Sequence, residues 1–295
     1  MRSYAFVTVD VFTDRRFGGN PLAVFPDASG LADSEMQSLA AEFNLSETTF
    51  VLPPSDPAHT ARVRIFNRTA EMPFAGHPNV GTGYVLAGLG RDKDGVLLFE
   101  EKAGLVEVRL DRDDAGVAIG ATIAAPQPLS LGIELPVEAI AGCVGIDPAE
   151  VVVSAHRPVV ASVGNPFVIA EVTGAALSRA APDPGRFRQV EADWPALEKR
   201  LSLHLYARGG ERIRARMFAP LAGTFEDPAT GSANAPLAAL LLSLTKEASR
   251  SYEIVQGVEM GRPSLLHASA RRTADGIRAT VGGGCVPVLR GEALV

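Results

Sequence analysis

The alternation of apolar and polar residues predicts a chain rich in short strands. Residues 4–11 alternate from one position to the next, which is typical of a strand with one buried face. The other segments expected to form strands are 22–25, 48–52, 62–66, 105–110, 117–123, 151–153, 167–171, 212–218, 253–258, 265–270, 277–281 and 286–289. So many short strands indicate curved sheets rather than a bundle of helices.

Two segments show the periodicity of surface helices. Apolar residues between 36 and 43 fall at i, i+3, i+4 and i+7, the spacing of one buried stripe. Asp33 or Ser34 can cap this helix, and it is expected to end near Asn44. A further surface helix is predicted at residues 194–205.

Two other helices are expected to be buried. Residues 77–89 and 232–244 are apolar on nearly every side, and a helix without a polar face usually lies inside its domain. Pro78 falls in the first turn, where a helix tolerates proline, whereas Pro236 lies deeper and makes the start of the second helix less certain.

A nine-residue motif occurs twice. Residues 71–79 and 226–234 both read Glu-x-Pro-x-x-Gly-x-x-Asn, at a spacing of 155 residues. Gly-Asn-Pro also occurs at 19–21 and 164–166, at a spacing of 145 residues. Gly, Pro and Asn can recur simply because turns favour them. Two motifs repeated in the same order, however, indicate a duplicated fold. The boundary is expected at the Ala-Pro-Gln-Pro segment 125–128, which gives lobes of residues 1–125 and 126–283.

Composition excludes several classes of protein. The 295 residues are 46% hydrophobic and 21% charged, which suits a globular protein of two lobes. A net charge of −6 without a basic patch argues against nucleic acid as a partner. The sequence predicts neither a signal peptide nor a membrane helix. Two cysteines outside any paired spacing, Cys143 and Cys285, suggest a reducing cytoplasm.

The two buried helices carry the chemistry that the repeat implies. If they begin at Gly76 and Gly231, their free N–H groups can bind a carboxylate or phosphate. Two such ends are expected to face one cleft between the lobes, which is the predicted active site.

The polar residues near the two glycines differ between the copies. His77 follows the first glycine, while Asp227 precedes and Ser232 follows the second. Unlike groups at matching places suit a reaction in which a proton leaves one position and arrives at another. Glu47, where a helix gives way to a strand, is the third acid–base candidate. The alternatives are a capping or core histidine, a turn aspartate and a solvated glutamate.

Several motifs resemble one known family. They are Asp-Val-Phe at 10–12, Gly-Asn-Pro at 19–21, Asn-Leu-Ser-Glu-Thr at 44–48, both copies of the repeat, Arg-Met-Phe at 216–218 and the ending 281–291. Together they resemble the phenazine-biosynthesis PhzF-like family over nearly the whole chain. The resemblance implies the α+β diaminopimelate epimerase fold, with two pseudo-symmetric lobes. Each is a barrel-like, mostly antiparallel sheet around a central helix, and the final strand, 284–295, returns to the first lobe.

The resemblance also implies a cofactor-free isomerase similar to trans-2,3-dihydro-3-hydroxyanthranilate isomerase. In that scheme Glu47 carries the proton, and His77 and Asp227 bind and polarise the substrate. Residues implied to contact a small carboxylate substrate are Asn20, Gly76, Gly231 and Ser232. A homodimer is implied as well, with neither nucleic acid nor a membrane as a partner.

Other features limit this scheme. Related epimerases use a thiol just before each glycine, but Ala75 and Thr230 stand there, so a two-thiol mechanism is argued against. Cys285 is expected to be a small residue in the closing strand, and Cys143 to be buried. Residues 67–70 depart from the usual pattern of the family; Arg68 is expected in a loop there, the alternative being that it reaches an anion of the substrate.

Two alternatives to the isomerase remain open. The protein could bind a small molecule without turnover. Alternatively, Glu47, His77 and Asp227 could hold the metal of a hydrolase, although their spacing matches no familiar metal-binding motif.

Overall fold

The computed structural model describes residues 1–295, which divide into two compact units. The first unit comprises residues 1–124 and 282–295, and the second comprises residues 125–281. The sequence places these boundaries at 125/126 and 283/284. Strand β18 (Gly276–Leu294) runs through the second boundary and contributes to both units.

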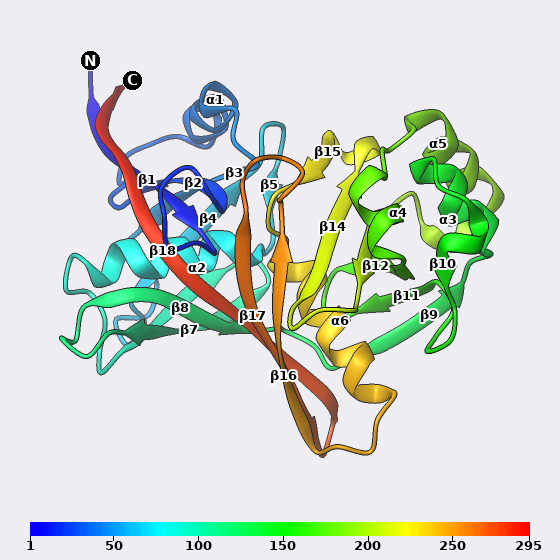
Figure 1. Ribbon diagram of the computed structural model, residues 1–295. Coiled ribbons are helices and arrows are strands. Elements are labelled where there is room, and N and C mark those ends of the chain that lie inside the picture. The colour runs from blue at the N-terminus through cyan, green and yellow to red at the C-terminus, as the bar shows by residue number, and fades with distance from the viewer. The chain divides into compact units, whose positions relative to one another are not determined.

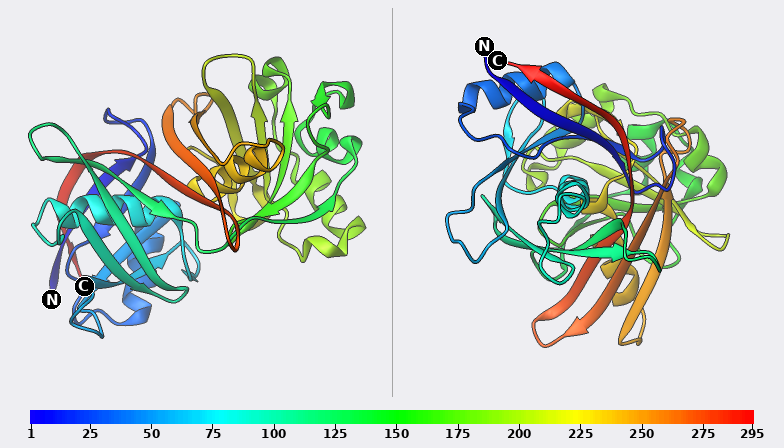
Figure 2. Two further views of the ribbon diagram at one scale, coloured as in Figure 1. Left: turned by 90° about the horizontal axis from the view of Figure 1, so that it is seen from below. Right: turned by 90° about the vertical axis from the view of Figure 1, so that its left-hand side faces the viewer.

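The first unit contains two helices and a ring of strands (Figure 1). Its elements are β1 (Ser3–Val11), β2 (Asn20–Phe25), α1 (Asp33–Phe43), β3 (Glu47–Leu52), β4 (Ala61–Phe66), β5 (Glu71–Met72), α2 (Gly76–Ala87), β6 (Val96–Glu101), β7 (Gly104–Arg112) and β8 (Ala118–Ala124). Hydrogen-bonded pairs follow the order β18, β1, β2, β3, β4, β6, β7 and β8, and β8 pairs with β18 again. The ring closes around α2, which the right-hand view of Figure 2 shows end-on.

The second unit repeats this order of pairing. Its elements are β9 (Ser130–Glu134), α3 (Val137–Val144), η1 (Pro148–Glu150), β10 (Val151–Val152), β11 (Val159–Ser162), β12 (Pro166–Val172), α4 (Gly174–Arg179), α5 (Pro184–Asp193), η2 (Pro195–Leu197), β13 (Leu203–Ala207), β14 (Ile213–Ala219), η3 (Pro220–Ala222), β15 (Thr224–Asp227), α6 (Gly231–Ser243), β16 (Ser249–Gln256) and β17 (Ser264–Thr273). The pairs β12–β13 and β14–β16 are parallel, as β2–β3 and β4–β6 are in the first unit. The duplication read from the motifs is therefore present in the strand order.

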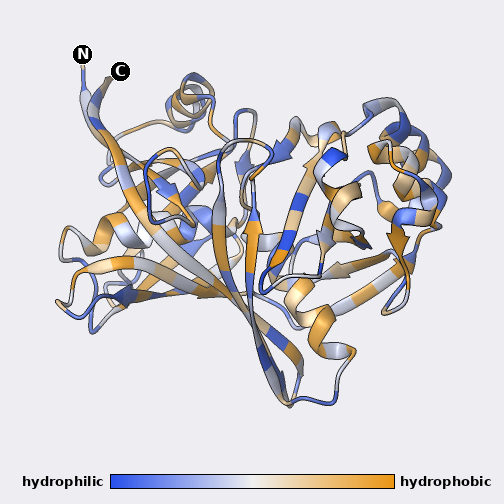
Figure 3. Ribbon diagram, in the orientation of Figure 1, coloured by the Kyte–Doolittle hydropathy of each residue, from blue (hydrophilic) through white to orange (hydrophobic).

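The central helices have the predicted character. Almost every residue of α2 and α6 is buried, and Figure 3 shows α6 coloured as hydrophobic along most of its length. Small residues let strands approach α2 closely. A Cβ added to Gly81 would lie 2.7 Å from Leu22 Cδ2 and 2.8 Å from Val11 Cγ2, so only glycine fits there.

Helix α1 confirms the predicted helix and its end at Asn44, but the prediction that Asp33 or Ser34 caps it is wrong. It begins at Asp33 after an N-cap at Ala32, and its C-cap, Asn44, takes the left-handed conformation at φ 51°. Glu35 closes the first turn by accepting a hydrogen bond from the Ala32 N–H at 2.7 Å.

The prediction of a helix at residues 194–205 is wrong. Only the short η2 turn occurs there, followed by the buried strand β13, which pairs in parallel with β12. The apolar residues of this segment fill a central strand, and a short apolar run does not distinguish strand from helix. The helix of this region is α5, which begins earlier, at Pro184, and Asp183 caps its first turn by accepting a hydrogen bond from Gly185 N–H.

The two strands predicted at 277–281 and 286–289 are one continuous strand, β18. Its last part pairs antiparallel with β1, from Cys285 opposite Val11 to Leu294 opposite Ser3. The chain termini are consequently side by side, and Arg2 N–H donates to the Val295 carbonyl at 2.8 Å (Figure 1).

Candidate active site

In the first unit, Glu47 and His77 face each other. Glu47 is the first residue of β3, and His77 is the second residue of α2. Glu47 Oε2 lies 3.5 Å from His77 Nε2, and the two side chains are 19% and 7% exposed. That separation is longer than a hydrogen bond, so the pair is in contact but leaves room for adjustment. A carboxyl and an imidazole at this distance can exchange protons with a ligand or with each other.

Burial keeps the His77 imidazole neutral. It lowers the pKa of His77 to about 3, because removing the ring from water penalises its charged form. A facing carboxylate acts in the opposite direction, but burial dominates for a ring that is almost entirely enclosed. His77 Nε2 has no hydrogen-bond partner, so a neutral ring can still donate or accept a hydrogen bond there.

The N-terminus of α2 is uncapped. Its N-cap residue is Ala75, whose side chain offers no acceptor to the first N–H groups at Gly76 and His77. These groups and the positive end of the helix dipole suit a carboxylate. The α2 terminus therefore combines an anion-binding end with the Glu47–His77 pair.

Asn20 belongs to the same region of the first unit. It is fully buried at the start of β2, and its Oδ1 accepts a hydrogen bond from Ser46 Oγ at 3.0 Å. Ser46 precedes Glu47, so this bond fixes the backbone where the catalytic candidate begins its strand. The structure thus brings together Asn20, Glu47, Gly76 and His77.

In the second unit, Asp227 lies at the N-terminus of α6. Thr230, the N-cap residue of α6, donates its hydroxyl to Asp227 Oδ2 instead of capping the helix. Gly231 and Ser232 form the first two positions of the helix, and Ser232 is half-buried. The second unit thus brings together Asp227, Gly231 and Ser232. The cleft expected between the lobes stays a prediction.

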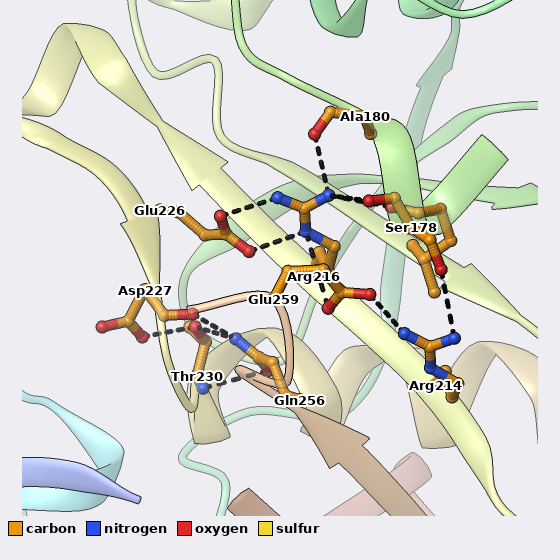
Figure 4. A network of polar contacts seen from close by, with 10 residues as sticks. Ser178, Ala180, Arg214, Arg216, Glu226, Asp227, Thr230, Gln256 and Glu259 are labelled. Carbon is orange, nitrogen blue, oxygen red and sulfur yellow. Dashed lines mark hydrogen bonds and ion pairs between the residues drawn. The ribbon is translucent and has the colours of Figure 1, made fainter. Parts of the chain in front are cut away.

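Gln256 organises this end of α6, and sequence reasoning missed it. Its Nε2 donates to the Asp227 carbonyl at 2.8 Å and to Thr230 Oγ1 at 3.0 Å. Its Oε1 accepts from Thr230 N–H at 3.2 Å and from Asn234 Nδ2 at 2.8 Å. One buried amide therefore ties together the strand, the N-cap and the helix. Figure 4 shows its bonds to Asp227 and Thr230.

The repeated glutamates have a structural task that the sequence did not reveal. Arg216 holds Glu226 through Nε at 2.7 Å and Nη2 at 2.8 Å, as Figure 4 shows. Arg64 holds Glu71 in the same two-pronged way, at 2.8 and 2.7 Å. Each arginine stands two residues before a phenylalanine in its strand, which is the signal that could have identified the pairs. The pairs anchor the short strands that lead into the two helix ends.

The remaining candidates have no placed role in the site. Arg68 is half-buried in the turn at residues 67–70, where Asn67 N–H donates to the Ala70 carbonyl. Cys143 and Cys285 are free and buried, and burial raises the pKa of both thiols.

No cluster of three or more His, Cys, Asp or Glu side chains is arranged to hold a metal ion. None of the helices is long and apolar enough to span a membrane.

The fold and the site define a class of duplicated α+β proteins with a carboxyl–imidazole pair at an uncapped central helix. Known proteins agree with this class. The chain matches the PhzC-PhzF family, described as phenazine biosynthesis-like protein, over residues 9–291. It therefore belongs to that family and is an isomerase of the PhzF type with the diaminopimelate epimerase-like fold.

Individual relatives cover the chain almost completely. An uncharacterized isomerase of Mesorhizobium japonicum is 38% identical and covers 100% of both chains. The trans-2,3-dihydro-3-hydroxyanthranilate isomerase of Pseudomonas aeruginosa is 38% identical over 94% of each chain. The crystal structure of a PhzF-family phenazine biosynthesis protein from Bacillus anthracis superposes with a TM-score of 0.89 at 26% identity, over 100% of both chains.

Proposed function

We propose that this isomerase moves a proton between positions of a small carboxylate-bearing substrate and that Glu47 carries the proton. The observation that supports this most directly is the 3.5 Å contact between Glu47 Oε2 and His77 Nε2 beside the uncapped end of α2. A carboxyl group beside a buried imidazole and free backbone N–H groups can take a proton from one carbon and return it to another.

The other residues have distinct roles in this proposal. The N–H groups at Gly76 and His77 bind the substrate's carboxylate, and neutral His77 hydrogen-bonds the substrate where charge develops. Asp227, Gly231 and Ser232 of the second unit bind polar groups of the same substrate, and Asn20 supports the Glu47 segment.

For the substrate, we propose a cyclic, unsaturated carboxylate similar to trans-2,3-dihydro-3-hydroxyanthranilate. Support comes from relatives named for that activity at 38% identity over 94% and 98% of this chain. An anion-binding helix end beside an acid–base pair suits such a molecule.

Solvent-deuterium exchange tests the role of Glu47. The protein is incubated in D2O with trans-2,3-dihydro-3-hydroxyanthranilate and related cyclic carboxylates, and NMR follows labelling of the ring carbons. Wild type should label a carbon, and Glu47→Gln should lose labelling while ligand still raises its thermal midpoint. Glu42→Gln, at an exposed glutamate of α1, is the matched control and should label like wild type.

Retained labelling in Glu47→Gln would remove this residue from the role. Ligand-induced stabilisation of wild type without any labelling would instead favour a non-catalytic binding protein. A homodimer and a cytoplasmic location also stay proposals, and light scattering of the purified protein tests the first.

A further inference from the structure

Glu101 is a buried acid that the proposed mechanism does not use. It ends β6, in the first unit, and both of its carboxyl oxygens are buried without a hydrogen-bond partner. The same is true of Asn79 Oδ1, on the facing helix α2. The Asn79 side chain is close enough to act on the Glu101 carboxyl. The Glu101 carboxyl and Asn79 Oδ1 are thus buried polar groups whose hydrogen bonding is incomplete.

The internal repeat shows what belongs at this place. Gln256 follows Glu101 by 155 residues, the spacing that separates the two copies of the motif. Both residues end equivalent strands, because β6 is parallel to β4 and antiparallel to β7 as β16 is to β14 and β17. Glu101 is therefore the counterpart of Gln256.

The surroundings of the two residues correspond as well. Asn79 Nδ2 donates to the Ala75 carbonyl at 3.0 Å, and Asn234 Nδ2 donates to the Thr230 carbonyl at 3.0 Å. By the same spacing, Met72 corresponds to Asp227, whose carbonyl accepts from Gln256 Nε2.

An ionised Glu101 cannot replace Gln256, because a carboxylate accepts hydrogen bonds but donates none. A neutral glutamic acid can, since it keeps one acceptor oxygen and presents an O–H where glutamine presents its amide N–H. It can donate to the Met72 carbonyl, as Gln256 donates to that of Asp227. It can accept from Asn79 Nδ2, as Gln256 accepts from Asn234 Nδ2.

We propose that Glu101 is a positioning residue that works as a neutral acid and holds the N-terminus of α2 as Gln256 holds that of α6. This deepens the proposed function and rests on it for the effect on catalysis. A neutral Glu101 also leaves the positive end of α2 to the substrate's carboxylate, whereas an ionised one would compete with that anion.

Electrostatics around Glu101 agree with this assignment. Burial raises the pKa of Glu101 to about 8, with the Asn79 side chain opposing the shift. The charged groups of neighbouring elements are engaged elsewhere. Lys102 and Arg64 pair with Glu71, Glu100 pairs with His59, and Glu47 faces the neutral His77.

Measurements without substrate test whether the Glu101 carboxyl is protonated. Infrared spectra should show a buried protonated carboxyl near neutral pH that Glu101→Gln removes. Because the folded pKa is raised, the contribution of Glu101 to stability should fall as pH rises from about 4.5 to about 8, measured as the difference between Glu101→Gln and wild type. Glu101→Gln should equal wild type at low pH and exceed it at pH 8, while Gln256→Glu should acquire the same loss. Absence of a protonated band assignable to Glu101 would overturn the proposal.

Exchange kinetics test the positioning. Glu101→Gln should stay within about twofold of wild type, whereas Glu101→Leu should lose about 10²-fold in kcat/KM because the helix end shifts. Above pH 8 the KM of wild type should rise, and that of Glu101→Gln should not. Equal loss in Glu101→Gln and Glu101→Leu would overturn the positioning role. If no substrate shows exchange in wild type, the proposed function fails while the infrared and stability results still decide the state of Glu101.

Discussion

Arg216 and Glu226 form a two-pronged ion pair in which the side chains are only 7% and 15% exposed. The same arginine donates to the carbonyls of Leu177 and Ala180, at 2.8 and 2.7 Å. It therefore joins α4 to the strand that leads into the end of α6. A buried charge in this position depends on its partner for stability.

Glu226→Gln should consequently lower the free energy of unfolding by up to about 3–5 kcal/mol, because the buried Arg216 guanidinium loses its two-pronged carboxylate and keeps only Glu259 Oε2, at 3.9 Å. Urea unfolding measures the change. Glu253→Gln breaks an exposed pair with Arg212 in the same unit and should cost less than about 1 kcal/mol. Equal losses in the two variants would contradict the structural role of Arg216.

The His77 imidazole should contribute to catalysis as a neutral group. His77→Asn should lower kcat by about 10²–10³-fold, the usual cost of removing one hydrogen-bonding group from the place where charge develops. His59→Asn, which alters a histidine paired with Glu100 outside the site, is the control and should leave kcat unchanged. A His77→Asn enzyme with wild-type kcat would show that the ring only packs.

The two buried histidines should make the protein sensitive to acid. Burial lowers the pKa of His77 to about 3 and that of His204 to about 4. Since the unfolded chain takes up these protons near pH 6.5 and the folded chain does not, the histidines' contribution to stability should fall as pH decreases from about 6.5 toward 4. Urea midpoints against pH measure the slope. His204→Gln should flatten it, and His267→Gln, at an exposed histidine, should retain it.

Asp227 tests whether the second unit acts on the substrate. Asp227→Asn keeps an acceptor for the Thr230 hydroxyl, so the end of α6 should persist while the charge is lost. We expect kcat/KM to fall at least about 10-fold, as for a lost charge-assisted hydrogen bond. Asp193→Asn, at an exposed residue of α5, is the control for charge alone. Unchanged kinetics in Asp227→Asn would restrict the chemistry to the first unit.

Only glycine should be tolerated at position 120, where β8 pairs with β18. A Cβ there would lie 2.2 Å from the Gly283 carbonyl oxygen, and backbone must move to admit it. Gly120→Ala should therefore lower stability by about 1–3 kcal/mol. Gly142→Ala, inside α3 with no atom within 4 Å of the added methyl, should raise stability by about 0.5–1 kcal/mol. Thermal unfolding distinguishes the two signs.

The sequence specified a large part of this fold because its signals are local. Motif spacing revealed the duplication, all-round apolar composition identified α2 and α6 as central, and Asn44 marked the end of α1. The buried strand β13 was mistaken for a helix, because only its partners β12 and β14 determine that it is a strand.

The sequence by itself determined the repeat, the family and the candidate acids and bases, since these depend on residue identity and order along the chain. Tertiary structure alone decided which of them meet. It placed Glu47 next to His77 and paired the repeated glutamates with arginines. It also buried the carboxyl of Glu101, which occupies in the first unit the position that Gln256 occupies in the second. Partners far apart in sequence are chosen by strand pairing and burial, and burial also sets which acids and bases keep their protons.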